Sequence, residues 1–445
     1  MEQYKIDNLE LITDELILAL IERYKTNEVP RLHKLQQYYL GNTAIKNRKM
    51  TDASKPNNKI SNPFASMITE TVIGYFLGYP IAYKSEDEDL MLKLQDIYNE
   101  NHERSHNNKM GKQLSIKGIA YELIYIDEEK KVKFNQLDAE NVFIIYDNSI
   151  NPKPLMAVRF FDIKDYVNDS FITKIETYTE DTITNYVVDG ESLILESEPV
   201  AHYFKGVPVI RYANNDELMG DYEKVMDLID AYDLAISNTS NDLSYFSDSY
   251  LVLSGMENTE PEDISEMKEN RVMLLGENGK AEWLIKSQQN VEIEEFKNRL
   301  KDDIHNFSFV PDLGSDSFGT ATSGESLKYK LFGLENAISI KERHMTESLE
   351  DRIELITTIL NIKGANHVHT DVKMNFTRNI PTNMTAIADS ISKLIGVVSH
   401  ETILSILPFI DDPASELAKI KHESEDSMYA DTFAENAVEA PIEEV

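Results

Sequence analysis

Three residues in the last quarter of the chain have the types and spacing of a metal site: His367, His369 and Asp371. Residues 367–377 have the pattern of a strand, and on a strand alternate side chains point to the same face. The three groups would then lie together, and two imidazoles with a carboxylate suit zinc or a related ion. Metal-dependent hydrolysis is therefore one alternative function for this chain.

The same pattern resembles the beginning of the metallo-β-lactamase signature and departs from it at once. Val372 stands where that signature has the histidine for a second metal, and only His400 and His422 follow. We therefore interpret the three residues as a polar strand face and predict no metal, no cofactor and no enzymatic activity. The chain also lacks the G-x-x-x-x-G-K-[ST] phosphate loop of an ATP-driven motor and the G-x-S-x-G elbow of many hydrolases.

The composition is strongly acidic. The 445 residues contain 44 Lys and Arg against 78 Asp and Glu, a net charge of −34. Favourable DNA binding needs cations that neutralise phosphates, so such a chain is unsuited to gripping DNA. The charge suits a surface that lets DNA slide or, more simply, a soluble surface. There is no cysteine, which is compatible with assembly in a reducing cytoplasm.

We expect neither a membrane span nor a signal peptide. The most apolar run, residues 67–83, is interrupted by polar residues, Gly and Pro, and predicts a buried helix that ends near Gly78. The first 25 residues are rich in acids, unlike a secretory signal.

Residues 290–364 hold the most informative elements. Apolar residues at spacings of four, four and three predict an amphipathic helix over 290–308. They are Phe296, Leu300, Ile304 and Phe307. A second apolar stripe predicts a helix over 324–361, about 55 Å long at 1.5 Å per residue. This stripe consists of Leu327, Leu331, Leu334, Ile338, Leu349, Ile353 and Ile356.

A loop rich in Gly, Ser, Asp and Thr joins these helices, and it has two interpretations. It is either a solvated turn of a helical hairpin or a pore element that rigid helices hold in a channel. Its glycines permit unusual dihedral angles. Phe318 lies near its tip, and Lys328 and Lys330 place positive charge directly behind it. Thr322-x-x-Glu325 has the spacing of a capping box, which marks the start of the long helix.

The remaining pattern predicts an α+β fold. Amphipathic helices are expected over 8–24, 28–40, 102–118 and 221–247. Alternating segments from 119 to 203 predict an antiparallel sheet, with a hairpin turn at 127–130. Short strands are expected over 249–255 and 271–287, and three short helices over 383–398, 399–407 and 413–422. The acidic residues 424–445 have the composition of a disordered tail.

The order of these elements, and the wording FSFVPDLGSDSFGTATSGESLKYKLFGLE, resemble the portal proteins of tailed double-stranded DNA bacteriophages. The nearest type is the siphophage portal of Gram-positive hosts. The resemblance covers about residues 5–425 and implies an α/β wing, a helical stem, a small α/β clip, a long kinked helix and a helical crown. It assigns the segments as follows: wing 1–220, first stem helix 221–247, clip 248–289, second stem helix 290–308, tunnel loop 309–323, long helix 324–364, crown 365–423 and acidic tail 424–445.

The resemblance also implies a function. A portal is a non-enzymatic ring, usually a dodecamer, at the capsid vertex of the virion, and the genome enters and leaves through it. Its implied partners are non-specific double-stranded DNA, the terminase large subunit, the head-completion adaptor, the scaffold and the major capsid protein. A passive structural ring that never meets DNA is a further alternative.

The candidate site residues fall into two groups. The loop and channel group consists of Asp312, Ser315, Asp316, Ser317, Phe318, Thr320, Thr322, Lys328 and Lys330. The clip group, for partner docking, consists of Glu262, Glu266, Lys268, Lys280 and Trp283. Trp283 has two interpretations, packing in the core or burial against a neighbouring subunit.

Residues 31–60 are basic within an otherwise acidic chain. They contain seven Lys and Arg and a single acid, Asp52. The cations are Arg31, Lys34, Lys46, Arg48, Lys49, Lys55 and Lys59. A solvated loop or an intersubunit salt-bridge partner is one interpretation, and contact with nucleic acid or another partner is the other.

Overall fold

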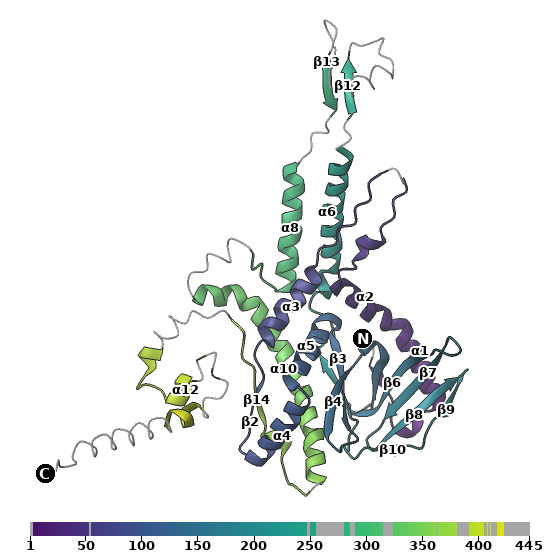
Figure 1. Ribbon diagram of the computed structural model, residues 1–445, viewed down its shortest axis with the longest axis vertical. Coiled ribbons are helices and arrows are strands. Elements are labelled where there is room, and N and C mark those ends of the chain that lie inside the picture. The colour runs from purple at the N-terminus through teal and green to yellow at the C-terminus, as the bar shows by residue number, and fades with distance from the viewer. Residues whose placement is uncertain are drawn as a thin grey trace, which may run out of the picture.

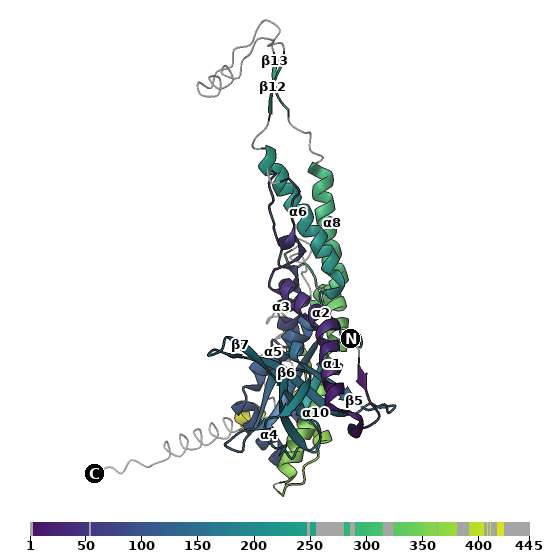
Figure 2. The same ribbon diagram turned by 90° about the vertical axis from the view of Figure 1, so that its right-hand side faces the viewer.

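The computed structural model describes residues 3–52, 55–246, 250–254, 280–284, 290–314, 324–362, 364–380, 391–404, 407, 410 and 416–421. They form an elongated molecule in which α6 (Met226–Phe246) and α8 (Asn290–Ser308) project from a mixed α and β body (Figure 1, Figure 2). The predicted α+β class is confirmed. Within the described residues, no helix combines the length and the apolar character that crossing a membrane requires.

Helices from the first part of the chain cover the body. They are α1 Asp14–Asn27, α2 Val29–Tyr39, α3 Phe64–Phe76, α4 Glu88–Glu100 and α5 Glu103–Lys117. Four of them were predicted, and α1 begins later than expected because the Thr13 hydroxyl caps the amide of Leu16. Helix α4 was missed, although Asp87 caps it in the same way.

Strands within residues 142–201 and the short N-terminal β1 form the larger sheet, whose order is β1-β5-β6-β7-β8-β10 with β9 paired to β8. Its strands are β1 Tyr4–Lys5, β5 Val142–Tyr146, β6 Pro154–Asp165, β7 Ser170–Tyr178, β8 Thr182–Asp189, β9 Ser192–Leu195 and β10 Val200–Ala201. The pairs from β5 to β10 are antiparallel, as predicted, whereas the short β1 runs parallel to β5.

A smaller sheet has the order β11-β3-β4, from Val209–Ala213, Ile119–Ile126 and Val132–Leu137. Strands β3 and β4 are antiparallel with Ile126 opposite Val132, which confirms the predicted hairpin at 127–130. Beyond the far ends of α6 and α8, β12 (Tyr250–Ser254) pairs antiparallel with β13 (Lys280–Leu284) (Figure 1).

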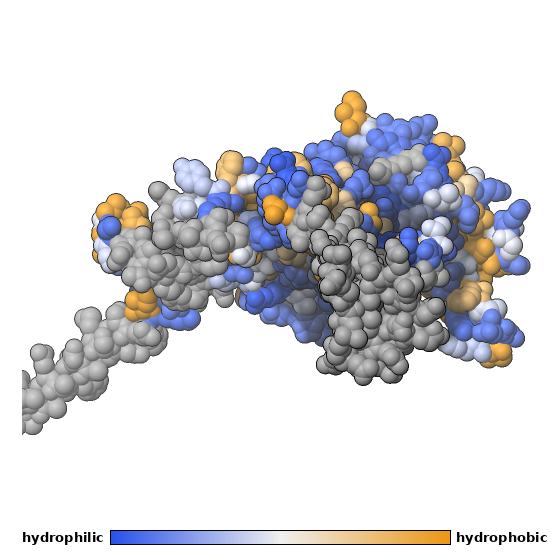
Figure 3. All heavy atoms as spheres, turned by 90° about the horizontal axis from the view of Figure 1, so that it is seen from above, coloured by the Kyte–Doolittle hydropathy of each residue, from blue (hydrophilic) through white to orange (hydrophobic). Residues whose placement is uncertain are grey.

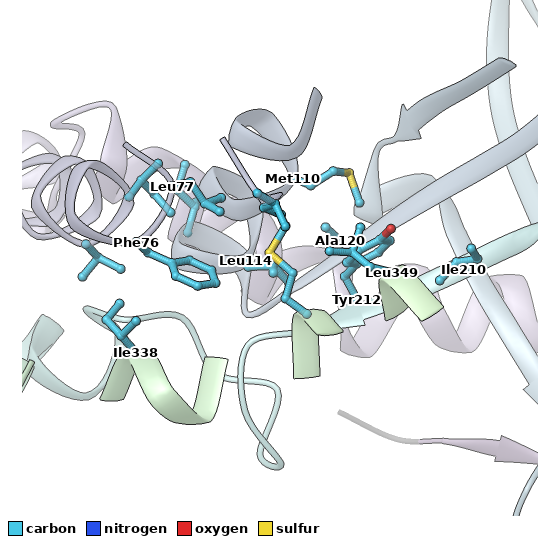
Figure 4. Packing of buried hydrophobic residues seen from close by; sticks show 14 of the residues in the cluster. Phe76, Leu77, Met110, Leu114, Ala120, Ile210, Tyr212, Ile338 and Leu349 are labelled. Carbon is cyan, nitrogen blue, oxygen red and sulfur yellow. The ribbon is translucent and has the colours of Figure 1, made fainter. Parts of the chain in front are cut away.

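Helix α10 (Gly324–Ile362) runs into the body and changes direction along its length (Figure 1). Its predicted apolar stripe is confirmed: the stripe from Leu331 to Ile356 is buried, and Leu327 packs against its edge. Figure 4 shows Ile338 and Leu349 of α10 near side chains of α3 and α5, among them Phe76, Met110 and Leu114. A long helix thus gains its stability from the body, because one face is covered along most of its length.

A buried polar network fixes α10 to the sheet and to α5. The guanidinium of Arg352, fully buried, donates to both carboxylate oxygens of Glu122 at 2.9 and 2.7 Å and to Asn107 Oδ1 at 2.9 Å. The hydroxyl of Tyr212 donates to Glu122 at 2.8 Å, and His106 Nε2 lies 2.5 Å from its other oxygen. Burial alone would raise the pKa of Glu122, but Arg352 and His106 lower it to about 2.

The strand predicted for residues 367–377 is wrong in its first half. The segment His369–Asp371 is a 3-10 turn, in which the amides of Asp371 and Val372 bond to the carbonyls of Val368 and His369. Only Lys373–Asn375 forms a strand, β14, which pairs with β2 (Ala82–Lys84).

Of the three predicted C-terminal helices, α12 (His400–Leu404) and the helical residues 391–394 and 416–421 are described. The rest of these helices, and the predicted acidic tail, lie outside the described residues.

Candidate functional site: the stem helices and the base of the loop

The stem, defined here as α6 and α8, is an amphipathic pair whose apolar faces are only partly covered. Leu300 and Ile304 of α8 are buried, as their spacing predicted. Phe296 and Phe307, from the same predicted face, remain 54% and 57% exposed, because a single neighbouring helix cannot cover the full width of the stripe. Leu243 on α6 is exposed as well. Aromatic and aliphatic groups of this size on a projecting helix pair indicate a further contact.

The cations of α8 are taken up by acids of the same chain. Lys297 Nζ lies 2.6 Å from Glu294, Arg299 Nε 2.8 Å from Asp303, and Lys301 Nζ 2.5 Å from Asp312. The exposed acids Glu292, Glu295 and Asp302 form no ion pair with any described residue. At helical spacing the three share the side of α8 that faces away from Leu300 and Ile304, together with Arg299, whose guanidinium is paired with Asp303. This side is predominantly acidic and is called the acidic stripe below.

A polar segment, residues 42–52 and 55–62, lies along α6 and is called the strap below. The buried carboxylate of Asp233 accepts bonds from the Thr43 hydroxyl at 2.5 Å and from the amide and side chain of Asn62 at 2.8 Å. One turn further, Ser237 Oγ accepts from the Ile60 amide at 3.0 Å. One turn beyond that, Asn241 Oδ1 accepts from the Asn58 amide at 2.7 Å. These bonds fix an irregular chain to one face of a helix.

The strap was not predicted, although α6 carries a signal for it. Asp230, Asp233, Ser237, Asn241 and Ser244 fall on one side of a helix at spacings of three and four. A polar stripe of this kind, on a helix whose other face is apolar, indicates that another segment packs there. The side-chain oxygens of the stripe can accept hydrogen bonds from the backbone amides of that segment.

The basic segment 31–60 has two different environments. Arg31 is structural, because its guanidinium binds both oxygens of Glu223 at 2.7 Å and the carbonyl of Leu218 at 2.8 Å. Lys34 lies over the ring of Tyr38. The other five cations belong to the strap, and none forms an ion pair within the described part of the chain. They are Lys46, Arg48, Lys49, Lys55 and Lys59.

The strap cations that do make contacts use neutral acceptors. Lys46 and Lys59 donate to each other's carbonyl oxygens at 3.1 and 2.9 Å, and Arg48 donates to Asn238 of α6 at 2.9 Å. Their positive charge is therefore not neutralised by an acid of the described chain.

The loop that follows α8 is fixed at its base. Phe309 adopts a left-handed conformation with φ of 59°, and Val310 is buried. His305 Nδ1 lies 2.9 Å from the Val310 carbonyl oxygen. Asp312 accepts the Gly314 amide at 3.1 Å and pairs with Lys301. Burial opposes ionisation of Asp312, but Lys301 and this amide lower its pKa below the ordinary value.

Helix α10 also touches this base. A Cβ added to Gly333 would lie 3.4 Å from the ring of Phe309, so α10 leaves room there for the aromatic side chain. The loop therefore starts from a rigid point between α8 and α10.

The structure places part of the predicted loop group. Asp312 lies at the loop base, with its carboxylate engaged by Lys301. Lys328 is exposed on the first turns of α10 and Lys330 is half-buried. Ser315, Asp316, Ser317, Phe318, Thr320 and Thr322 lie outside the described residues.

For the predicted clip group, Lys280 opposes Ser254 and Trp283 opposes Leu251 in the β12–β13 pair. Their side chains lie outside the described part of the structure, as do Glu262, Glu266 and Lys268 entirely. The two interpretations of Trp283 thus stay open.

The proposed metal ligands are directed elsewhere. His367 Nδ1 lies 2.6 Å from Asp87, the capping residue of α4, and its Nε2 lies 3.2 Å from Lys93. His369 and Asp371 lie in the 3-10 turn described above. Across the described residues no group of three ligands is placed to hold a metal ion. The role of His367 in this geometry is to join the segment after α10 to the start of α4.

Residues 18–429 match the family model described as "Phage portal protein, SPP1 Gp6-like". The chain belongs to this family. The portal protein of Bacillus phage SPP1 is 24% identical over 435 residues, which cover 92% of this chain and 86% of that protein. The portal protein of Clostridium phage phiCD119 is 24% identical over 427 residues, which cover 89% and 93%. The resemblance predicted from element order and wording is confirmed, and a phage portal protein is a component of the virion.

Proposed function

We propose that this chain assembles into a ring-shaped channel at the capsid vertex, through which the genome enters during packaging and leaves on ejection. The observation that supports this best is the stem, which projects from a well-packed body with apolar and charged side chains exposed on its flanks. A helix pair built in this way is completed by neighbours in an assembly. The ring is a structural, non-enzymatic component, and a dodecamer is the size that we propose.

In this ring the stem helices, within 221–247 and 290–308, line the channel, and the loop 309–323 meets the DNA. The rigid base of the loop supports this role. Val310 is buried, Asp312 is paired with Lys301, and Phe309 packs beside Gly333. A loop that starts from a fixed point can hold its tip at a defined position near a substrate.

The other segments are assigned to partners. The clip, 248–289, docks the terminase large subunit during packaging and the head-completion adaptor afterwards. The wing, 1–220 with the far end of α10, faces the scaffold and the major capsid protein, and the crown, 365–423, faces the capsid interior. Assembly takes place in the host cytoplasm and involves no membrane.

The channel holds DNA weakly and without sequence preference. The net charge of −34 makes most surfaces of the ring repel phosphates, so no phosphate is held strongly enough to stop sliding. Exposed Lys328, repeated around the ring, adds a narrow basic belt next to the loop. A titration with duplex DNA at about 100 mM salt, where exposed charges are largely screened beyond roughly 10 Å, tests this. Nanomolar, sequence-selective binding would contradict the sliding channel.

Deletion of the loop tip, Ser315–Thr320, tests the channel role. We expect the deleted chain to form the same ring, because the described contacts of the loop base lie before Ser315. A phage that carries the deletion is expected to package or retain less DNA. Normal packaging and retention would remove the loop from the mechanism.

A second variant separates the length of the loop from its side chains. It replaces the same six residues with Gly and Ser. If Asp316 and Phe318 contact DNA, this variant resembles the deletion, whereas a purely steric loop keeps normal packaging.

A further inference from the structure

The two flanks of the stem carry opposite charge. Figure 1 shows the strap and α8 on different sides of α6, and the strap bonds to α6 and, at Asn42, to Gln37 of α2. The strap flank holds five cations without an ion-pair partner among the described residues. The α8 flank holds the acidic stripe, Glu292, Glu295 and Asp302. Neither set forms an ion pair within the described part of its own chain, although Asp302 lies near Arg299 and Lys301, and the Asp233 carboxylate binds the strap through Thr43 and Asn62.

The two flanks also lie at the same level of the stem. Because α6 and α8 run antiparallel, the end of α6 lies beside the beginning of α8 (Figure 1, Figure 2). The α6 residues that hold the strap, from Asp233 to Ser244, span about 17 Å at 1.5 Å per residue, and the acidic stripe spans about 15 Å. A basic and an acidic surface of similar length therefore lie at the same height along the stem axis, on different sides of one helix pair.

We propose that the strap of one subunit docks against the acidic stripe of α8 in the next copy of this chain. This inference rests on the proposed ring. In a closed ring every subunit presents one flank to one neighbour and the other flank to the second neighbour, so the contact surfaces differ and must complement each other. Five cations opposite three acids meet this condition at each of the repeated interfaces.

A polar contact suits the charges of both flanks. Seen from the stem end, the described surface that stays visible around the stem is mostly hydrophilic, with hydrophobic groups in scattered patches (Figure 3). Charge pairing of this kind selects the partner and its register. The exposed Phe296 and Phe307 lie beside the stripe on α8 and add apolar contact at its edge.

DNA is the competing occupant of the strap, and the channel interior is the competing location of the acidic stripe. A second copy of the chain is favoured because one arrangement neutralises both flanks at once, whereas DNA would neutralise the strap and leave the stripe facing solvent or phosphate.

The test is a charge swap in the full chain. One variant reverses the strap, Lys49→Glu with Lys55→Glu, at two positions whose side chains form no hydrogen bond to α6 in the described structure. A second reverses the stripe, Glu295→Lys with Asp302→Lys, and a third combines all four changes. Lys5→Glu with Lys109→Glu is the matched control for the strap variant, because these exposed lysines give the same change of net charge outside the stem. Circular dichroism melts establish that every variant is folded.

The readout is the protein concentration at which half of the chains are in rings, measured by mass photometry. We expect each single-flank variant to raise it about tenfold, and the combined variant to return to within about threefold of the wild type. The wild-type value is expected to rise with salt, because screening weakens the pairing. Labelled duplex DNA is titrated into each ring in parallel.

Three results would overturn the inference. If both single-flank variants assemble like the wild type, the charged flanks do not meet. If the combined variant is no better than the worse single variant, the two surfaces act separately. If the strap variant assembles normally but loses DNA binding, the strap contacts DNA instead. A different result would refute the proposed function. If the wild type forms no ring at any concentration, both the proposed ring and this inference fail.

Discussion

The body and the stem are stabilised by different kinds of contact. In the body, α10 is buried against α3, α5 and the smaller sheet, and Arg352, Glu122 and their partners form a network that water does not reach. In the stem, α6 is held by a polar strap, the ion pairs of α8 are at least partly exposed, and large apolar groups such as Phe296 face solvent.

The contrast indicates where each region obtains its stability. The core of the body is closed within one chain, because the apolar stripe of α10 is covered and the buried Arg352 is paired with Glu122. The stem keeps exposed surface on both flanks, and a free helix pair of this kind is stabilised mainly by what packs on it. Changes in the body should therefore affect folding, whereas changes on the stem flanks should affect assembly.

The largest effect is expected from Arg352→Met. The substitution leaves the carboxylate of Glu122 buried without its cation, and breaking a buried pair in this way costs about 3–5 kcal/mol of unfolding free energy. Urea denaturation measures the change. The double variant Arg352→Met with Glu122→Gln removes both charges and is expected to lose less. A loss below about 1 kcal/mol in the single variant would show that the network does not hold α10 to the body.

The same network predicts acid sensitivity. Because the pKa of folded Glu122 lies near 2, below its ordinary value of 4.5, the pair stabilises the fold above about pH 4.5. This contribution is lost as the pH falls from 4.5 towards 2. Melting temperatures of the wild type and of Glu122→Gln over this range test it. If the two decline in parallel, Glu122 is not responsible for the acid sensitivity.

An intermediate effect is expected at the junction of strap and stem. Asp233→Ala removes the acceptor for Thr43 and Asn62, and a buried donor left without a partner costs about 1–3 kcal/mol. Hydrogen exchange of the Asn62 and Ile60 amides should increase while the core strands stay protected. Ser244→Ala, which removes an exposed acceptor of Asn58, is the control and should change little. Equal protection in both variants would mean that the strap is held by other contacts.

The smallest effect is expected at the loop base. Lys301→Met breaks the pair with Asp312, and a half-exposed pair of this kind contributes less than about 1 kcal/mol. The pKa of Asp312 should rise towards its ordinary value, which NMR titration detects. A loss of stability comparable to that of Arg352→Met would contradict the distinction between body and stem.

Sequence patterns predicted the elements whose signals are local. Helix α8 was predicted at 290–308, because its apolar spacing is regular, and the β3–β4 hairpin was predicted from the polar turn between two alternating segments. The stripe of α10 was recovered for the same reason. The segment at 367–377 was assigned incorrectly, because alternation over a few residues does not distinguish a strand from a 3-10 turn followed by one.

Contacts between distant segments could not be predicted. Thr43 and Asp233 are 190 residues apart, and Glu122 and Arg352 are 230 apart, so no local pattern joins them. The basic composition of residues 31–60 was evident, but its division into a structural Arg31 and an exposed strap depends on the fold. For the loop, the sequence indicated which residues could face DNA. The structure adds the contacts at the base of the loop, between α8 and α10, that fix where it begins.

The most direct test of the account is the assembly state of the purified wild-type chain. Sedimentation velocity at micromolar concentration, with negative-stain images of the same sample, should show a closed ring with a central hole, which salt weakens. A stable monomer of 50.9 kDa at that concentration would contradict the account, because the stem flanks would then need no neighbour.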